Sequence, residues 1–284
     1  MYTLNCRGKL LMLDRPWVMG VINITPDSFY EGSRRQHLED VMKAAGEMIN
    51  CGAQIIDIGG QSTRPGSRRI SSQEEIDRTV PAIEQILGLY PEALISIDTY
   101  SSSVAEAAVQ AGAAIVNDIS SGDMDVDIIS VVARLKTPYI CMHMQGTPDN
   151  MQDNPRYENV TLAVLDYLIA KTEQCRKAGI HDVIIDPGFG FGKTIAHNFT
   201  LLKELSALRI IDRPLMVGLS RKSTIYKTLH TTPEEALNGT TVLNTIALMN
   251  GANILRVHDV KEAKEVIDLF WTYKKADHKK DRNE

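Results

Sequence analysis

The chain has 284 residues, of which 43% are hydrophobic and 24% are charged, enough for one large α/β barrel or two modest domains. Its net charge of −5 gives no global basic field for nucleic acid, which disfavours polymer binding but allows a local anion pocket. The first 17 residues lack the apolar core of a signal peptide, and no apolar run reaches the roughly 18 residues of a membrane span. We therefore expect a cytoplasmic protein.

The predicted elements begin with a β-hairpin in residues 1–13, which we expect to close the bottom of a barrel. Eight short apolar runs follow, each separated from the next by an amphipathic stretch, at residues 17–23, 55–58, 94–98, 115–118, 138–142, 183–186, 215–218 and 254–257. Runs that are apolar throughout are typical of parallel strands covered on both faces. Eight such βα units favour a TIM (β/α)8 barrel over a doubly wound sheet. We expect one domain over residues 1–276 and a charged, disordered tail at residues 277–284.

Helix starts are marked by three local patterns. Ser72 with Glu75 resembles a capping box, as does the segment 232–235, in which Pro233 would occupy the first helical turn. Asp259 with Glu262 gives a weaker version. The four cysteines show neither a Cys-x-x-Cys pair nor a Cys/His metal spacing, so we expect buried thiols in a reducing compartment.

Polar side chains stand where four of the predicted strands end, at Asn23, Asp98, Asn117 and Asp186. A carboxylate at the end of a buried strand costs several kcal/mol unless a ligand or partner compensates it. Carboxylate and amide groups suit the 2-amino-4-oxo-pyrimidine edge of pterins and guanine, because a carboxylate accepts two parallel N–H groups. A structural Asp bound to backbone amides is the alternative for any one of them, and we favour it for Asp118.

Two loops rich in Gly, Pro, Ser and Thr follow the first and second strands. The first contains Asp27 and Phe29, and the second contains Thr63, Arg64 and Pro65. Ordinary turn chemistry explains most such clusters. Because both loops would lie on the catalytic face of a barrel, we expect them to close over a ligand.

The segment DPGFGFGKT after the sixth strand comes close to a phosphate-binding P-loop. Pro187 stands where the first Gly of that motif is required, which excludes a nucleoside triphosphatase. Glycines alternating with aromatic residues instead let the backbone approach a flat ligand while a ring covers it. One of the two Phe residues is expected to fill the core, and we assign Phe191 to the ligand.

Basic residues follow the last two strands. The segment 220–223, SRKS, begins a predicted helix whose free N–H groups favour an anion, and Arg256 and His258 lie on one side of an extended chain. With Asn23, Thr63 and Arg64 they would form an anion cradle where barrels commonly hold phosphate. A solvated surface pair is the alternative for Arg256 and His258.

Eight collinear motifs over residues 17–270 resemble the dihydropteroate synthase family: MGVINITPDSF, IIDIGGQSTRPG, ISIDT, IVNDISSG, MHMQGTP, DPGFGFGK, GLSRKS and RVHDV. The resemblance implies a TIM barrel, a homodimer, and a transferase of folate biosynthesis. It would join 6-hydroxymethyl-7,8-dihydropterin diphosphate to 4-aminobenzoate, with Mg²⁺ as cofactor and sulfonamides as competitive inhibitors. The residues and the leaving group favour a dissociative substitution.

The resemblance also implies residue roles. The pterin would be held by Asp98, Asn117, Asp186 and Lys222, with Met142, Phe191 and Arg256 packed on its ring. The diphosphate would contact Thr63, Arg64, Arg256 and His258, and Asn23 would share Mg²⁺ with it. The aminobenzoate site would be formed by Phe29, Pro65, Lys222 and Ser223. Asp98, Lys222, Arg64 and Asp27 are the expected catalytic residues.

Two departures from the family pattern lie in the same loops: Tyr30-Glu31-Gly32 replaces Ser-Asp-Gly, and Gln61 stands where Glu is common. These two departures should affect drug affinity and loop ordering more than activity. The competing interpretations are a corrinoid-linked methyltransferase domain, which would not need the cationic cradle, and a catalytically silent pterin-binding paralogue.

Overall fold

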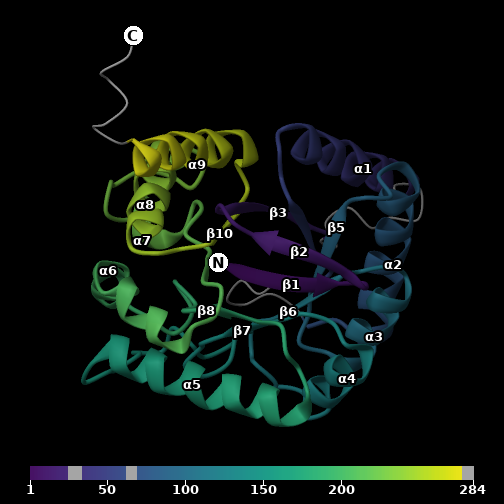
Figure 1. Ribbon diagram of the computed structural model, residues 1–284, viewed down its shortest axis with the longest axis horizontal. Helices are drawn as coiled ribbons and strands as arrows, with labels where there is room; N and C mark the ends of the chain where they lie inside the picture. The colour runs from purple at the N-terminus through teal and green to yellow at the C-terminus, as the bar shows by residue number, and fades with distance from the viewer. Residues whose placement is uncertain (25–33, 62–68, 277–284) are drawn as a thin grey trace.

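The protein is an eight-stranded parallel barrel with helices around it, and the computed structural model describes residues 1–24, 34–61 and 69–276 (Figure 1). The barrel strands are β3 (Trp17–Asn23), β4 (Ile55–Gly59), β5 (Leu94–Asp98), β6 (Ile115–Asp118), β7 (Tyr139–Met142), β8 (Val183–Asp186), β9 (Met216–Val217) and β10 (Ile254–Val257). The hydrogen-bonded order is β8-β7-β6-β5-β4-β3-β10-β9. A parallel bridge between Ile185 and Leu215 joins β8 to the segment entering β9, so the sheet returns on itself. The predicted TIM barrel is confirmed.

The helices lie outside the strands, in the order expected for repeated βα units. They are α1 (Arg34–Asn50), α2 (Ser72–Leu89), α3 (Ser102–Gln110), α4 (Ile128–Leu135), α5 (Val160–Ala178), α6 (Ile195–Lys203), the 3-10 helix η2 (Leu205–Ile211), α7 (Ser223–Tyr226), α8 (Leu237–Met249) and α9 (Val260–Lys275). In Figure 1 they form a ring around the barrel. No helix in the described ranges is long and apolar enough to cross a membrane.

The predicted hairpin is present and covers the amino-terminal end of the barrel. Strands β1 (Tyr2–Cys6) and β2 (Lys9–Leu13) pair antiparallel and lie across the centre of the ring in Figure 1. Leu4, Cys6 and Leu13 are buried in one cluster with residues from the beginnings of the barrel strands, among them Ile115 and Ile254. Removing this apolar surface from water stabilises the hairpin on the barrel and closes that end with packed side chains.

The predicted helix starts were wrong in detail. Helix α2 is capped by Ser71, whose hydroxyl accepts from the Glu74 amide, while Glu75 is buried against Gly60. The segment 232–235 precedes the helix: α8 begins at Leu237, and the carbonyls of residues 233 and 234 accept hydrogen bonds from the Arg221 guanidinium. That side chain holds the segment in a turn.

Asp259 is the N-cap residue of α9 as predicted, but its side chain makes no cap hydrogen bond and instead accepts from Arg221 at 2.7 and 2.9 Å. The prediction of buried thiols holds for Cys6, Cys141 and Cys175 and is wrong for Cys51, which is exposed; all four are free. Cys51 lies in the turn directly after α1.

Candidate active site

Four polar strand ends line up at the carboxyl-terminal end of the barrel. The strand register places Asn23 opposite Gly59, Gly59 opposite Asp98, and Asp98 opposite Asn117. Farther round the barrel, Met142 lies opposite Asp186. A Cβ on Gly59 would lie 3.4 Å from the Asn23 amide oxygen and 3.7 Å from a carboxylate oxygen of Asp98, so these side chains converge above a residue without one. The polar residues predicted at the strand ends therefore lie together at one end of the barrel.

Arg256 connects two carboxylates at this end of the barrel. Its Nε donates to Asp57 Oδ2 at 2.7 Å and its Nη2 donates to Asp98 Oδ2 at 2.5 Å, while Asn117 Nδ2 donates to the same oxygen of Asp57 at 3.0 Å. Asp57 is fully buried within β4 and was missed from the sequence. The signal for it was an acid inside an otherwise apolar strand, which requires a partner. Asp57 fixes both Arg256 and Asn117 at the pocket.

The Asp98 carboxyl is poised to change charge near neutral pH. Desolvation raises its pKa to about 7; Arg256 opposes this and Asp57 adds to it. Perturbed carboxyl groups of this kind gather at functional sites, because burial and neighbouring like charges are what shift them. Asp98 is thus a largely buried acid, with 12% of its side chain exposed, and it pairs with an arginine at the end of a barrel strand, where catalytic residues are found.

Asp186, Lys222 and Phe191 form the opposite part of the site. Asp186 accepts a hydrogen bond from the Gly188 amide at 2.7 Å. The Lys222 ammonium donates to the Phe189 carbonyl and lies 4.7 Å from the centre of the Phe191 ring, a cation–π contact. Burial lowers the pKa of Lys222 to about 8, and the nearby Asp186 opposes that shift. Phe189 is buried in the core while Phe191 is half-buried, as predicted for the pair.

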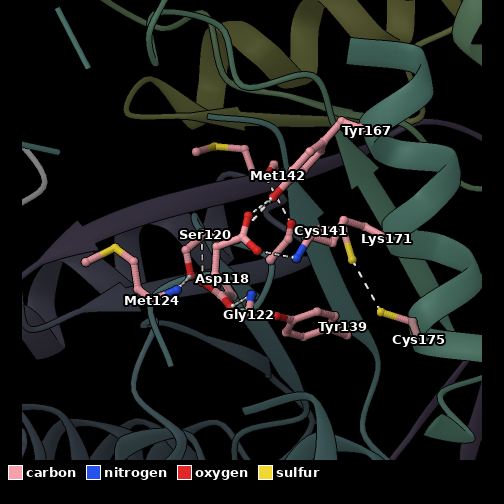
Figure 2. Close-up of polar contacts among 12 residues, drawn as sticks. Asp118, Ser120, Gly122, Met124, Tyr139, Cys141, Met142, Tyr167, Lys171 and Cys175 are labelled. Carbon is pink, nitrogen blue, oxygen red and sulfur yellow. Dashed lines mark hydrogen bonds and ion pairs between the residues drawn. The ribbon is translucent and has the colours of Figure 1, made fainter. Parts of the chain in front are cut away.

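Asp118 has the structural role predicted for it. Figure 2 shows its carboxylate accepting from the Ser120 amide at 2.7 Å, the Ser120 hydroxyl at 2.8 Å, the Gly122 amide at 2.8 Å and the Tyr139 hydroxyl at 2.6 Å. Four donors satisfy a carboxylate that burial would otherwise penalise. Asp118 therefore shapes the loop after β6 and is not available to a ligand.

The same loop positions Met142. The Ser121 hydroxyl donates to the Met142 carbonyl at 2.9 Å, and the Tyr167 hydroxyl donates to the Ser120 carbonyl at 3.2 Å and to Asp123 at 2.8 Å (Figure 2). These contacts tie the ends of β6 and β7 to α5, which carries Tyr167. Met142 is buried at the end of β7, on the side of the barrel that carries Asn117 and Asp186.

A second buried residue missed from the sequence is Lys193, the last residue of the DPGFGFGK motif. Its Nζ lies 2.9 Å from the Gly188 carbonyl, 3.0 Å from the Phe191 carbonyl and 2.9 Å from His143 Nδ1. Burial lowers the pKa of Lys193 to about 7, with Asp186 opposing the shift, and burial lowers the pKa of His143 to about 3. A lysine directly after a glycine-rich segment was the available signal.

The basic segment after β9 is divided between two tasks. Lys222 is the N-cap residue and Ser223 the first residue of α7, so the predicted helix start is confirmed, but α7 has four residues. Arg221 does not face the proposed anion cradle, because its guanidinium pairs with Asp259. His258 is exposed and its Nδ1 lies 3.0 Å from the Ser220 hydroxyl, which keeps the two last loops together.

The predictions for Asp27, Phe29, Thr63, Arg64 and Pro65, and for the departure at Glu31, fall outside the described residues. Asn23 is exposed at the end of β3, with an amide oxygen available to a cation. Among the residues that the structure describes, no group of three or more His, Cys, Asp and Glu side chains could hold a metal ion.

Charged and amide side chains gathered at the carboxyl ends of a parallel barrel define a TIM-barrel enzyme, with a pocket that combines hydrogen-bond acceptors, cations and a ring to stack on. A family model described as "Pterin binding enzyme" matches residues 19–258. The chain is 43% identical to the dihydropteroate synthase of Escherichia coli (strain K12) over 263 residues, covering 92% of this chain and 93% of that protein.

Solved structures of dihydropteroate synthases also match this chain. The Yersinia pestis dihydropteroate synthase in complex with a sulfonamide drug matches with a TM-score of 0.91 and 40% identity, covering 97% of this chain and 100% of that one. The Xanthomonas albilineans enzyme with 4-aminobenzoic acid matches with a TM-score of 0.89 and 36% identity, covering 97% and 99%. The chain belongs to the pterin binding enzyme family and, within it, to the dihydropteroate synthases.

Proposed function

We propose that the protein joins 6-hydroxymethyl-7,8-dihydropterin diphosphate to 4-aminobenzoate, giving 7,8-dihydropteroate and diphosphate for folate biosynthesis. The observation that carries this is the alignment of Asp98 and Asn117 at one strand-end level. Asp98 is paired with Arg256, and Asp186 and Lys222 lie at the same end of the barrel. The bound sulfonamide drug and 4-aminobenzoic acid in similar structures support a site for an aminobenzoate-like ring.

The pterin is recognised by the acceptors that remain open. Within the described part of the chain, Asp186 accepts from the Gly188 amide with one carboxylate oxygen, and Asn117 donates to Asp57 with its Nδ2. The other Asp186 oxygen and the Asn117 amide oxygen suit the N–H donors of a 2-amino-4-oxo-pyrimidine edge. Met142, Phe191 and the Arg256 side chain provide surfaces for the ring.

The reaction is a dissociative substitution. The C–O bond at the pterin methylene breaks, its electron pair leaves with the diphosphate, and the resulting cation is delocalised over the pterin near Asp98. The aniline nitrogen of 4-aminobenzoate forms the new C–N bond with its lone pair and then loses a proton to solvent. Arg64, Arg256 and His258 take up the charge of the diphosphate, and Lys222 stays at the ring. We assign Asp27 and Thr63 to the loops around the diphosphate and Phe29, Pro65 and Ser223 to the aminobenzoate site.

We propose Mg²⁺ as the cofactor, held by Asn23 together with the diphosphate. The exposed amide oxygen of Asn23 near Asp98 fits a hard cation that retains water and phosphate ligands. When bound, the ion would supply charge neutralisation for the leaving group. Chelation with EDTA should abolish turnover, and Asn23→Ala should raise the Mg²⁺ concentration needed to restore it.

We also propose a cytoplasmic homodimer. Four free thiols support a reducing compartment. Exposed apolar side chains on α8, Val242, Ile246 and Met249, support pairing of two copies through that helix. Sedimentation equilibrium of the wild type and of Ile246→Asp tests this: the variant should be monomeric at concentrations where the wild type is dimeric.

The function is tested by measuring diphosphate release from dihydropterin diphosphate and Mg²⁺, with and without 4-aminobenzoate. We expect release that depends on aminobenzoate, is inhibited by sulfonamide and falls at least 100-fold in Asp98→Asn. Asp166→Asn, at an exposed position on α5, is the control. Pterin binding without diphosphate release would indicate a silent binding protein and refute the proposal.

A further inference from the structure

Lys193 lies almost completely out of solvent, with 3% of its surface exposed, and no acidic side chain is hydrogen-bonded to it among the described residues. Its ammonium contacts four acceptors: the carbonyls of Gly188, Phe191 and His143 at 2.9, 3.0 and 3.3 Å, and the His143 ring nitrogen Nδ1 at 2.9 Å. Three N–H groups are shared among these acceptors. A neutral group of the same size that carries no donor would remove all of these hydrogen bonds and leave the Gly188 carbonyl with the Phe191 amide as its donor.

These acceptors belong to two different loops. Gly188 and Phe191 lie in the loop between β8 and α6, whereas His143 directly follows β7. The loops are in close contact: Gly188 has a φ of 67°, and a Cβ added to it would lie 1.9 Å from the His143 carbonyl oxygen. Lys193 is therefore the polar link between two backbone segments that already touch.

Both loops form walls of the site described above. The β8–α6 loop carries Phe191, whose ring faces the Lys222 ammonium, and Phe189, whose carbonyl accepts from Lys222. It also contains the Gly188 amide that orients Asp186. On the other side, His143 follows Met142, the last residue of β7. Fixing the two loops fixes the ring, the carboxylate and the apolar side chain together.

His143 is built to receive this lysine. Its ring is buried and packs edge-on against Tyr167, with ring centres 5.1 Å apart. Burial keeps its pKa far below neutral, so the ring is uncharged and Nδ1 offers a lone pair to the ammonium. Around the Lys193 ammonium, the carbonyl dipoles and the His143 ring nitrogen thus take the place of hydrating water.

We propose that Lys193 is a positioning residue for the pterin site, whose ammonium holds the β7 and β8 loops in the arrangement that Asp186, Phe191 and Met142 need to bind the pterin. This inference rests on the proposed function and adds to it a residue that does not touch the substrate. Loosening the two loops should weaken pterin binding, because the groups that the fold preorganises would no longer be aligned with the ligand.

The test is the affinity for 6-hydroxymethyl-7,8-dihydropterin, measured by calorimetry on folded protein without diphosphate. Lys193→Met keeps an unbranched side chain that extends as far as the Lys Cε and removes the ammonium. Lys203→Met, at an exposed position at the end of α6, is the matched control. We expect the Kd to rise at least tenfold in Lys193→Met and less than twofold in the control. In turnover, the KM for the pterin substrate should rise more than kcat falls.

A lysine that merely stabilises the fold would lower the free energy of unfolding and leave the pterin Kd of the folded protein at the wild-type value, which would overturn the proposal. If Lys193→Met does not fold, Lys193→Ala is titrated with propylammonium, which matches the side-chain atoms removed beyond Cβ, and neutral 1-propanol of the same size is the control. Pterin affinity restored by the ammonium and not by the alcohol supports the proposal, and affinity that responds to neither overturns it. Wild-type protein that binds no pterin would instead refute the proposed function.

Discussion

Asp98→Asn should make the ligand-free protein more stable above neutral pH while it destroys activity. The carboxyl is buried, and its pKa is raised from 3.8 to about 7 by desolvation. An acid whose pKa is raised on folding holds its proton more tightly in the folded state. Its contribution to the free energy of unfolding therefore falls as pH rises from the lower value to the higher one, and is level above it.

The magnitude follows from the width of that window. Between pH 5 and pH 8, about two pKa units of the shift are crossed, so the wild type should lose about 2–3 kcal/mol relative to a variant with no charge at this position. Asn keeps a carbonyl oxygen that can accept from Arg256, so the arginine retains a partner there as well as Asp57. The variant gains relative stability because it removes a charge that the fold alone does not need.

The assay is urea unfolding of both proteins without ligand, at pH 5 and pH 8, with Asp166→Asn as the surface control. Glu75, whose pKa burial raises to about 7, titrates in both proteins and interacts electrostatically with Asp98, so the difference between the proteins reports Asp98 together with its effect on Glu75. The stability difference, variant minus wild type, should grow by about 2–3 kcal/mol from pH 5 to pH 8. A difference that stays constant within about 0.5 kcal/mol would refute the assignment of Asp98 as the titrating acid.

Three further substitutions test the surrounding structure. Tyr139→Phe removes one of four donors to Asp118 and should lower the free energy of unfolding by about 1–3 kcal/mol in urea; an unchanged value would mean that the other donors suffice. Gly188→Ala should lower the free energy of unfolding by at least about 2 kcal/mol, because its φ is 67° and its Cβ would strike a backbone oxygen. Gly88→Ala, in a helix with open space around it, should raise the free energy of unfolding by about 0.5 kcal/mol. Equal shifts of the melting temperature in the two variants would contradict this. Arg256→Met should cost about 3–5 kcal/mol at pH 8 and less at pH 5, where one carboxylate partner becomes protonated; a pH-independent loss in urea unfolding would argue against that coupling.

The strands could be predicted from the sequence because each is a short, mostly apolar run, and four of them, β3, β5, β6 and β8, end in a polar residue. Residues 17–23 and 94–98 were predicted with the bounds that the structure shows. Parallel strands covered on both faces leave this pattern in the chain itself, and their carboxyl ends meet at one end of the barrel by topology alone. For that reason Asp98 and Asn117 could be assigned to one site before the structure was known.

Residues that depend on contacts between distant segments could not be predicted in the same way. Asp57 reads as the interior of a strand, and its role becomes visible once Arg256, 199 positions away, is placed beside it. Lys193 reads as the end of a turn until the carbonyls of two loops are seen around it. The false helix start near Pro233 has the same cause, because the guanidinium of Arg221 captures carbonyls that local propensity assigned to a helix.

The hairpin β1–β2 covers the amino-terminal end of a barrel whose interior is filled by side chains, so ligands approach the site from the carboxyl-terminal end. Leu4, Leu13 and Trp17 seal the far end with packed side chains, so nothing can pass through the molecule. We therefore expect the reactant that occupies the deeper position to bind first, because a second reactant bound above it would block its release. For the same reason, we expect the product nearest the opening to be released before a product that lies beneath it.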